Sequence, residues 1–251
     1  MVLTLDALRS ALWLVFAFAG YWLVDYLARR EARGQGVPGD WLEWWLALGA
    51  LVGGRVGHIL ATNPALLTSP MNLVRLTDGM SFWGALTGGG VALALGGVRR
   101  PRWSLLLASA YAIYLPFGIA LAHLPCPLYG ACGGKATTGP LAVLLPGAEV
   151  ARWPSDLYEG LGALVLGGVL LRLSARPQPP GRLAGFFLVC YAVLDAWLAP
   201  TRLVGASPAW MGTAVDLLFA LIGLAFLAYS LRQGKEDHAP RPDGHPGLPG
   251  V

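Results

Sequence analysis

Basic residues in this 251-residue chain lie between long apolar stretches, and most of them lie in every second gap. Seven apolar runs can be read, and each approaches the ~17–25 residues that a helix needs to cross the hydrocarbon core of a bilayer. They cover residues 8–28, 41–61, 82–98, 103–122, 157–173, 182–199 and 210–231. The pattern predicts an all-α protein, a polytopic membrane helical bundle of about seven transmembrane helices.

The gaps rich in arginine and lysine set the predicted orientation. Twelve of the 18 basic residues follow the first, third, fifth and seventh runs. They are Arg29, Arg30, Arg33, Arg99, Arg100, Arg102, Arg172, Arg176, Arg182, Arg232, Lys235 and Arg241. Because positively charged loops remain in the cytoplasm, we expect the amino terminus outside and the carboxyl terminus in the cytoplasm.

Composition excludes a soluble globular domain. Hydrophobic residues make up 55% of the chain and charged residues 13%, whereas a soluble surface needs about a quarter of its residues charged. The net charge of +4 comes from the arginines of the predicted cytoplasmic loops, and no basic stripe indicates a nucleic-acid partner. Residues 1–233 are predicted to form one transmembrane domain whose first run is retained, and 234–251 a disordered cytoplasmic tail.

The longest outward segment lies between the fourth and fifth runs and covers residues 123–156. A connection of that length usually has a function. Because it contains apolar stretches, we expect it to lie on the membrane interface or to fold back over the bundle. A plain extracytoplasmic connector is the alternative. The basic loops are short by comparison, so function is expected on the outer side.

Glycines recur at the spacing that brings membrane helices close together. Gly53 and Gly57 lie in the second run, and Gly84 and Gly88 in the third. Close helix packing is the simpler interpretation, and room for a lipid head group is the alternative. Arg55 lies between the first two glycines. A charge that faces lipid there costs ~2.5–3.5 kcal/mol, so its side chain is expected to face the bundle interior or a wet cavity.

Four carboxylates lie within or at the edges of the apolar runs. They are Asp25, Glu159, Asp195 and Asp216. Asp25 and Asp195 are open to three interpretations: a partner for a nearby arginine, a helix cap or a functional group. Glu159 follows Pro154 in a plausible helix start, where the helix dipole favours acidic side chains, so a structural role and a site role both remain open.

The three cysteines do not form a disulfide framework. Cys126 and Cys132 share the outer loop and could oxidise, whereas Cys190 in the sixth run is interpreted as a small buried apolar residue. His123, Cys126 and Cys132 also have the spacing H-x2-C-x5-C. They supply three potential ligands without a convincing fourth, so no metal site is predicted.

Four longer motifs stand out along the chain. They are GGRVGHIL at 53–60, GMSFWGALTGG at 79–89, HLPCPLYGACGGKAT at 123–137 and RWPSDLYEG at 152–160. Together they resemble the prolipoprotein diacylglyceryl transferases of bacterial inner membranes. The last motif is the most specific, because that family carries a segment of the form R-H-P-S-x-L-Y-E at the start of its fifth span. The family also shows seven spans with the amino terminus outside.

Departures from the family pattern concern functional side chains more than the scaffold. Trp83 and Trp153 stand where the family has histidine, and His123 stands where alignment expects arginine. Lys135 replaces a later arginine of the signature segment. Near the sixth span, alignment offers Asp195 for another family arginine.

The resemblance implies transfer of the diacylglyceryl group of phosphatidylglycerol to the lipobox cysteine of a prolipoprotein, the first step of lipoprotein maturation. A thiol that attacks the glyceryl carbon benefits from a base, and the departing glycerol phosphate from fixed cations. The implied catalytic residues are His123, Arg55 and Glu159. The implied substrate-binding residues are Lys135, Arg202, Arg152, Trp83, Tyr158 and Gly130. Neither a cofactor nor a metal is implied, and the implied partners are phosphatidylglycerol, prolipoprotein signal peptides and the lipid bilayer.

The sequence leaves two other functions open besides transfer. A non-catalytic, lipid-binding member of the same fold is favoured by the missing histidine and arginine. A transporter or channel is less favoured, because such proteins often contain inverted repeats and no internal symmetry is visible.

Overall fold

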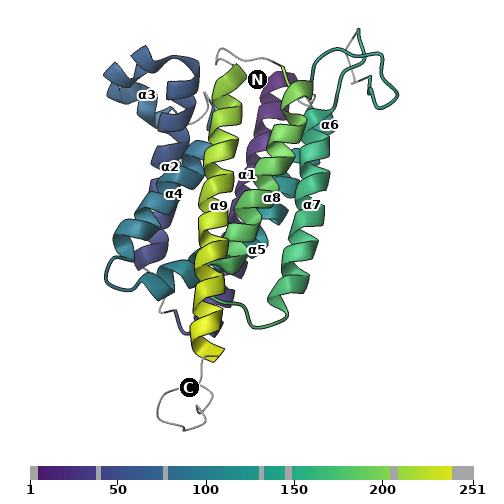
Figure 1. Cartoon of the computed structure of the whole chain (residues 1–251). Coiled ribbons are helices and arrows are strands. Elements are labelled where there is room, and N and C mark those ends of the chain that lie inside the picture. The colour runs from purple at the N-terminus through teal and green to yellow at the C-terminus, as the bar shows by residue number, and fades with distance from the viewer. Residues whose placement is uncertain are drawn as a thin grey trace, which may run out of the picture.

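The computed structural model describes residues 5–37, 41–75, 79–129, 133–144, 149–203 and 209–238. The described part is a bundle of long helices with short helical turns in three of its connections (Figure 1). The helices that coincide with the seven predicted runs are α1 (Leu5–Gly34), α2 (Trp41–Thr62), α4 (Phe82–Gly96), α5 (Pro101–His123), α7 (Ser155–Ser174), α8 (Arg182–Leu198) and α9 (Ala209–His238). The predicted fold class is therefore confirmed.

Length and hydropathy fit membrane crossing. Within the described residues, five helical segments are long and apolar enough to span a bilayer. They are Leu42–Thr62, Pro101–His123, Ser155–Ser174, Arg182–Thr201 and Trp210–Gln233. Helix α4 is apolar but has only 15 residues. Large apolar side chains such as Val165 and Trp197 are exposed on the helix surfaces, as expected where the solvent is lipid.

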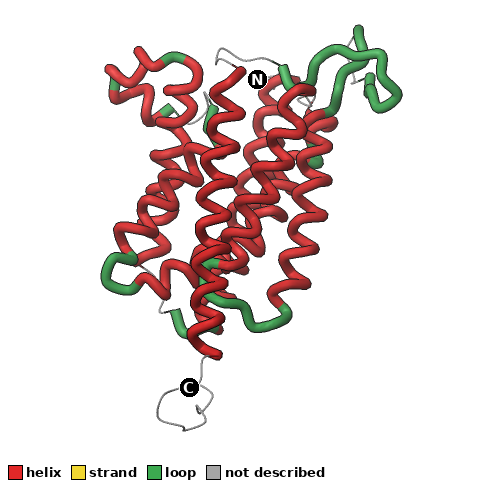
Figure 2. Tube along the Cα trace, in the orientation of Figure 1, coloured by secondary structure: helices red, strands yellow, loops and turns green. Residues whose placement is uncertain are grey.

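Loops gather at the two ends of the bundle (Figure 2). We call the end that holds the α1–α2, α4–α5 and α7–α8 connections the basic end, because three of the predicted arginine clusters lie there. The opposite end, the loop end, holds the short helices η1 (Pro64–Thr68), α3 (Pro70–Val74) and α6 (Cys126–Tyr129), together with the segment that leads to α7. This segregation is what the positive-inside rule requires of one cytoplasmic face.

Helix α5 lies inside the bundle and packs against α1, α4, α7 and α8. The main apolar core includes Ile113 of α5, Leu170 of α7, Phe187 and Tyr191 of α8, and Phe219 of α9. These residues are buried. The core therefore fixes the relative positions of α5, α7, α8 and α9.

Helices α2 and α4 form a separate, close pair. Their glycines meet backbone to backbone, since a Cβ atom built on Gly57 would lie 2.8 Å from Cα of Gly84 and one on Gly53 would lie 2.7 Å from Cα of Gly88. Side chains at these positions would hold the helices apart. The interpretation of the repeated glycines as a packing motif is confirmed.

A polar cluster ties α1, α2 and α5 together. Arg29 places its guanidinium 2.8 Å from Asp25 and 3.0 Å from Glu43. The Tyr111 hydroxyl donates to the other oxygen of Asp25 at 2.7 Å. Of the interpretations left open for Asp25, pairing with a nearby arginine is thus the one observed.

The end of the chain differs in one respect from the predicted boundary. Helix α9 continues to His238, so residues 234–238 of the predicted tail are helical. Residues 239–251 lie outside the described residues. The disorder predicted for them stays a prediction.

Candidate active site

Glu159 is the centre of a buried polar cluster at the loop end. Helix α7 begins at Ser155 after Pro154, with Asp156 in its first turn, and Glu159 follows on the next turn. Its side chain is only 7% exposed. One carboxylate oxygen accepts a hydrogen bond from Arg202 at 2.6 Å, and the other accepts from the Tyr191 hydroxyl. Both carboxylate oxygens of Glu159 therefore have hydrogen-bond donors from other helices or loops.

Arg202 joins two carboxylates that come from different helices. It follows the short helix η3 (Ala199–Thr201), and its second terminal nitrogen pairs with Asp195 of α8. Burial alone would lower the pKa of Arg202, but the charges of Glu159 and Asp195 outweigh it and raise that pKa above its ordinary value. Arg202 is thus a permanent cation that holds α7 and α8 together.

Asp195 also contacts two groups from other helices. The indole N–H of Trp83 on α4 donates to Asp195 at 3.1 Å. The carboxyl group of Asp216 on α9 lies close enough to Asp195 for the two groups to interact electrostatically. Asp195 therefore contacts α4 and α9 as well as Arg202.

Asp216 is buried, and its Oδ1 atom has no hydrogen-bond partner among the described residues. A buried carboxyl oxygen without a partner is costly in a low-dielectric environment. The site thus contains one acceptor atom that a substrate hydroxyl or a water molecule could satisfy.

His123 ends α5 beside the same cluster. Its Nδ1 atom lies 3.7 Å from Asp156, and its Nε2 atom lies 3.9 Å from Glu159. These distances are too long for hydrogen bonds, but they are short enough for the two carboxylates to stabilise a charged imidazole. The side chain is 33% exposed, whereas that of Glu159 is only 7% exposed, so His123 is accessible at the edge of the cluster.

A metal ion does not fit this arrangement well. His123, Asp156 and Glu159 offer three ligand atoms within 4.8 Å of one another. Glu159 is already bound by Arg202, whose permanent charge would repel a cation. Cys126 is disulfide-bonded, and Cys132 lies outside the described residues. The H-x2-C-x5-C reading therefore loses Cys126, because a disulfide sulfur is not a thiolate ligand.

Trp83 forms part of an aromatic wall next to the carboxylates. Its ring stacks on Phe219 at a centroid distance of 4.3 Å and meets Tyr191 edge to face at 5.5 Å. The position where the family resemblance expects histidine thus holds a group that donates a hydrogen bond but takes up no proton. Trp83 was predicted to bind substrate, and the structure places it beside the Glu159 cluster.

Arg55 is 2% exposed and lies in α2, where it binds the connection between α2 and α4. Its guanidinium donates to the carbonyl oxygens of Asn72 at 2.7 Å and Gly79 at 2.9 Å. Gly79 has a φ angle of +117°, and a Cβ atom there would lie 2.6 Å from Cε1 of His58. The expectation that Arg55 faces the bundle interior agrees with its burial. Its hydrogen bonds to this connection are a positioning role that the sequence did not predict.

Three of the remaining predicted residues shape the long loop. The ammonium group of Lys135 donates to Pro200 O at 2.9 Å, Arg152 donates to Gly134 O at 3.3 Å, and the Tyr158 hydroxyl donates to Leu141 O at 2.6 Å. All three acceptors are backbone carbonyls. Gly130, the last predicted residue, lies outside the described residues.

The long loop also forms backbone pairs with the segment that carries Arg202. Gly134 forms an isolated antiparallel bridge with Arg202, and the N–H of Lys135 donates to Thr201 O at 2.8 Å. The Ser155 hydroxyl lies 2.9 Å from that of Thr201. This part of the loop therefore packs against the segment after α8 and holds Arg202 in place.

The sequence did not predict that Tyr191 donates a hydrogen bond to Glu159. An aromatic residue in an apolar helix is usually a core residue, and Tyr191 is indeed buried. Tyr191 and Asp195 are four residues apart, which puts them on one face of α8. That spacing is the sequence signal that could have linked them.

The fold and the cluster together define a class of protein. The chain is a polytopic membrane protein with a buried, hydrogen-bonded site of ionisable groups at one end of its helices, and such groups within membrane helices are usually functional.

Comparison with known proteins identifies the family. A family model described as prolipoprotein diacylglyceryl transferase matches residues 10–229. Two similar proteins are named phosphatidylglycerol--prolipoprotein diacylglyceryl transferase. The one from Rhizobium leguminosarum bv. trifolii is 34% identical over 75% of this chain and 72% of its own length. The one from Sodalis glossinidius is 30% identical over 87% of this chain and 88% of its own length. The chain belongs to the prolipoprotein diacylglyceryl transferase family.

Proposed function

We propose that this chain transfers the diacylglyceryl group from phosphatidylglycerol to the lipobox cysteine of prolipoproteins, at the outer face of the bacterial inner membrane. Family membership and the names of the relatives support this reaction. The observation that carries the proposal is the buried Glu159–Arg202–Asp195 network at the loop end. The positive-inside rule assigns that end to the outer face.

The reaction forms one bond and breaks another. The cysteine sulfur bonds to the terminal glyceryl carbon, and the bond between that carbon and the phosphate oxygen breaks. The phosphate oxygen keeps the electron pair and leaves as glycerol phosphate, while the thiol proton passes to a base. A transferase site must therefore accept a proton near the sulfur and meet the negative charge of the phosphate.

His123 is the proposed base. It is the accessible imidazole of the cluster, and its Nε2 atom is closest to Glu159. Asp156 and Glu159 stabilise the imidazolium that forms when the proton is taken up. A histidine with carboxylates beside it is a common arrangement for this step, because the reference pKa of ~6.5 lies near the operating pH.

Arg202 is proposed to orient the site and to contribute positive charge toward the phosphate. It is 30% exposed although two carboxylates hold it. Lys135 and Arg152 line the loop above it and add positive charge on the same side. Arg55 is proposed to act together with them toward the lipid phosphate, while its hydrogen bonds to Asn72 and Gly79 fix the loop before α4.

One observation favours a second function. Trp83 cannot exchange a proton, and both terminal nitrogens of Arg202 already bind carboxylates. The same site could thus hold a lipid head group without transferring its diacylglyceryl group. This lipid-binding protein would have the fold and the lipid of the family but would form no thioether.

A reconstituted assay separates the two functions. The purified full-length protein is placed in vesicles that contain phosphatidylglycerol, and a lipobox peptide is added. Mass spectrometry then measures the thioether product and the retained lipid. We expect product from the unaltered protein and at least about a hundredfold less from His123→Ala, since general bases contribute roughly 10²–10⁴-fold.

Controls connect the result to the site. Arg176 is exposed in the α7–α8 connection at the basic end, so Arg176→Ala should keep full product. Arg55→Ala should lose product while the protein still inserts, and Arg55→Lys should keep part of it because the charge remains. Retained phosphatidylglycerol with no thioether from the unaltered protein would support the lipid-binding function and reject transfer.

A further inference from the structure

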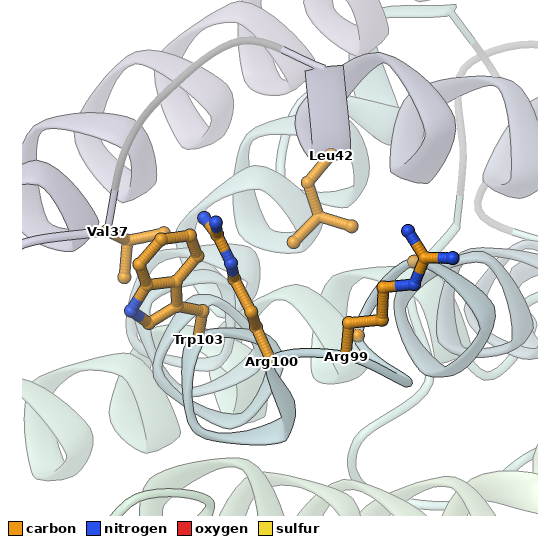
Figure 3. Close-up of a pocket in the computed structure, with 7 residues that line it drawn as sticks. Val37, Leu42, Arg99, Arg100 and Trp103 are labelled. Atoms are coloured by element: carbon orange, nitrogen blue, oxygen red, sulfur yellow. The ribbon is translucent and has the colours of Figure 1, made fainter.

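A pocket of about 250 Å³ lies at the basic end, far along the helices from the Glu159 cluster. It is lined by Val37, Leu42, Gly96, Gly97, Arg99, Arg100 and Trp103 (Figure 3). Sites for drug-sized molecules occupy ~300–1,000 Å³. The pocket therefore suits a phosphorylated head group rather than a whole lipid.

The pocket forms where three connections meet. Val37 follows α1, Leu42 lies in the first turn of α2, and both side chains are buried. The turn between α4 and α5 supplies the other side. Gly97 ends α4 tightly, because a Cβ atom there would lie 2.7 Å from Cβ of Ser104. This tight turn brings two successive arginines to the edge of an apolar floor.

Charge in the pocket is positive. Arg99 and Arg100 are both exposed, and the lining contains no acidic residue. The guanidinium carbon of Arg100 lies 4.1 Å from the ring centroid of Trp103, so the indole orients that side chain. Figure 3 shows the side chains of Arg99 and Arg100 extending from the α4–α5 turn toward Leu42, with one guanidinium group on each side of it. Two cations without acidic partners in the lining are suited to a phosphate group.

Helix termini add to this charge. Helix α5 begins at Pro101, and Arg100 makes no side-chain hydrogen bond at its N-cap position. Helix α2 begins at Trp41, next to the lining residue Leu42. Both helices therefore direct the positive ends of their dipoles toward the region of the pocket.

The depth of the pocket in the membrane indicates which phosphate compound it binds. The arginine clusters assign the basic end to the cytoplasmic face, and tryptophan is enriched at the level of the lipid head groups. Anionic head groups of the cytoplasmic leaflet lie at this level, and basic pockets between membrane helices bind them. A soluble phosphate has the same chemistry but a much lower local concentration.

We propose that this pocket binds the phosphate of an anionic phospholipid of the cytoplasmic leaflet. Arg99 and Arg100 bind the phosphate oxygens, Trp103 holds Arg100 in position, and the acyl chains lie along the apolar helix surfaces. The bound lipid ties the α1–α2 connection to the α4–α5 turn. This site is separate from the proposed active site and does not depend on the transferase function.

The test measures lipid retention by the full-length protein. The protein is purified in a neutral detergent and titrated with cardiolipin, with phosphatidylcholine as the zwitterionic comparison. Native mass spectrometry counts bound lipid. Removal of both arginines by Arg99→Gln and Arg100→Gln should weaken cardiolipin retention by about ten- to thirtyfold. Phosphatidylcholine binding should hardly change.

The control removes the same charge from the same end. Arg172 and Arg176 are exposed near the α7–α8 connection and do not line the pocket. Arg172→Gln with Arg176→Gln should leave retention within about twofold of the unaltered protein. Equal losses in the two double variants would overturn the proposal, because general surface charge would then explain binding.

A further arm separates lipid from soluble phosphate. Inorganic phosphate and glycerol phosphate are added at millimolar concentration before cardiolipin. Undiminished cardiolipin retention supports a lipid site. The opposite result would be displacement of cardiolipin by either soluble anion in the unaltered protein, with no such displacement in the Arg99→Gln, Arg100→Gln variant. That result would assign the pocket to a soluble phosphate compound and overturn the lipid assignment.

Discussion

Gly88→Ala should separate α2 from α4 and lower the stability of the protein. The new Cβ atom would overlap the carbonyl oxygen of Gly49 and lie 2.8 Å from Cα of Gly53. Ordinary contacts of a Cβ atom begin near 3.4 Å. Both obstacles are backbone atoms of a packed helix, so neither can rotate away. Because the contact with the Gly49 carbonyl oxygen is the shorter of the two, the helices must move apart by roughly 1 Å or more, which close-packed interiors resist.

Gly90→Ala provides a matched control two residues further along α4. A Cβ atom at Gly90 meets nothing within 4 Å. Alanine is favoured over glycine inside a helix by about 1 kcal/mol. This gain applies at both positions, so it cancels in the comparison. What remains at Gly88 is the cost of overpacking, about 1–3 kcal/mol, and the double backbone overlap places it in the upper half of that range.

Thermal unfolding of the detergent-solubilised variants at one scan rate measures the difference. A chain of this length loses roughly 2–4 °C of midpoint per kcal/mol, so Gly88→Ala should unfold roughly 4–12 °C below Gly90→Ala. Gly90→Ala should equal or exceed the unaltered protein. A midpoint of Gly88→Ala at or above that of Gly90→Ala would refute the close backbone packing of α2 and α4.

Three further predictions concern the charges and the topology. Arg202→Gln should lower the free energy of unfolding by about 3 kcal/mol, because it leaves two buried carboxylates without a cation. Adding Glu159→Gln should restore part of the lost unfolding midpoint. If the losses of the two substitutions were strictly additive, the pairing would be contradicted. A reporter fused to the carboxyl terminus should be active in the cytoplasm. Activity in the periplasm alone would show that the predicted orientation is wrong. Chelation with EDTA should leave thioether formation unchanged, whereas a loss that zinc restores would revive His123, Asp156 and Glu159 as metal ligands.

The helices could be predicted because the signal for a membrane span is local. Each span is a continuous apolar run, and its helix needs no partner to satisfy its backbone. The short helix α4 shows the limit of this signal. The apolar run continues to residue 98, but the helix ends at Gly96, because the Gly96–Gly97 pair allows the chain to turn toward Ser104. The exact end depends on that contact between two helices.

The site could be predicted only in part, because ion pairs between distant segments leave no local pattern. Glu159 and His123 were singled out from the motifs around them, and they do lie in one cluster. Arg202 was predicted to bind substrate as a cation, but its ion pair with Glu159, 43 residues away along the chain, was not predicted. The hydrogen bond from Tyr191 to Glu159 also joins two helices. A sequence shows which groups can pair, and the packing of the helices decides which do.

The ion pairs of Arg202 with two helices affect how the protein inserts into the membrane during its synthesis. Glu159 and Asp195 enter the membrane on α7 and α8, and the arginine that neutralises both is synthesised after them. An uncompensated carboxylate at the centre of a membrane helix costs ~2.5–3.5 kcal/mol on insertion scales, and somewhat less near its end. Until residue 202 leaves the ribosome, both helices are therefore poor candidates for release into lipid one at a time. They should stay beside the insertion machinery, or carry protons, and then enter the bilayer as a pair once translation has passed Arg202.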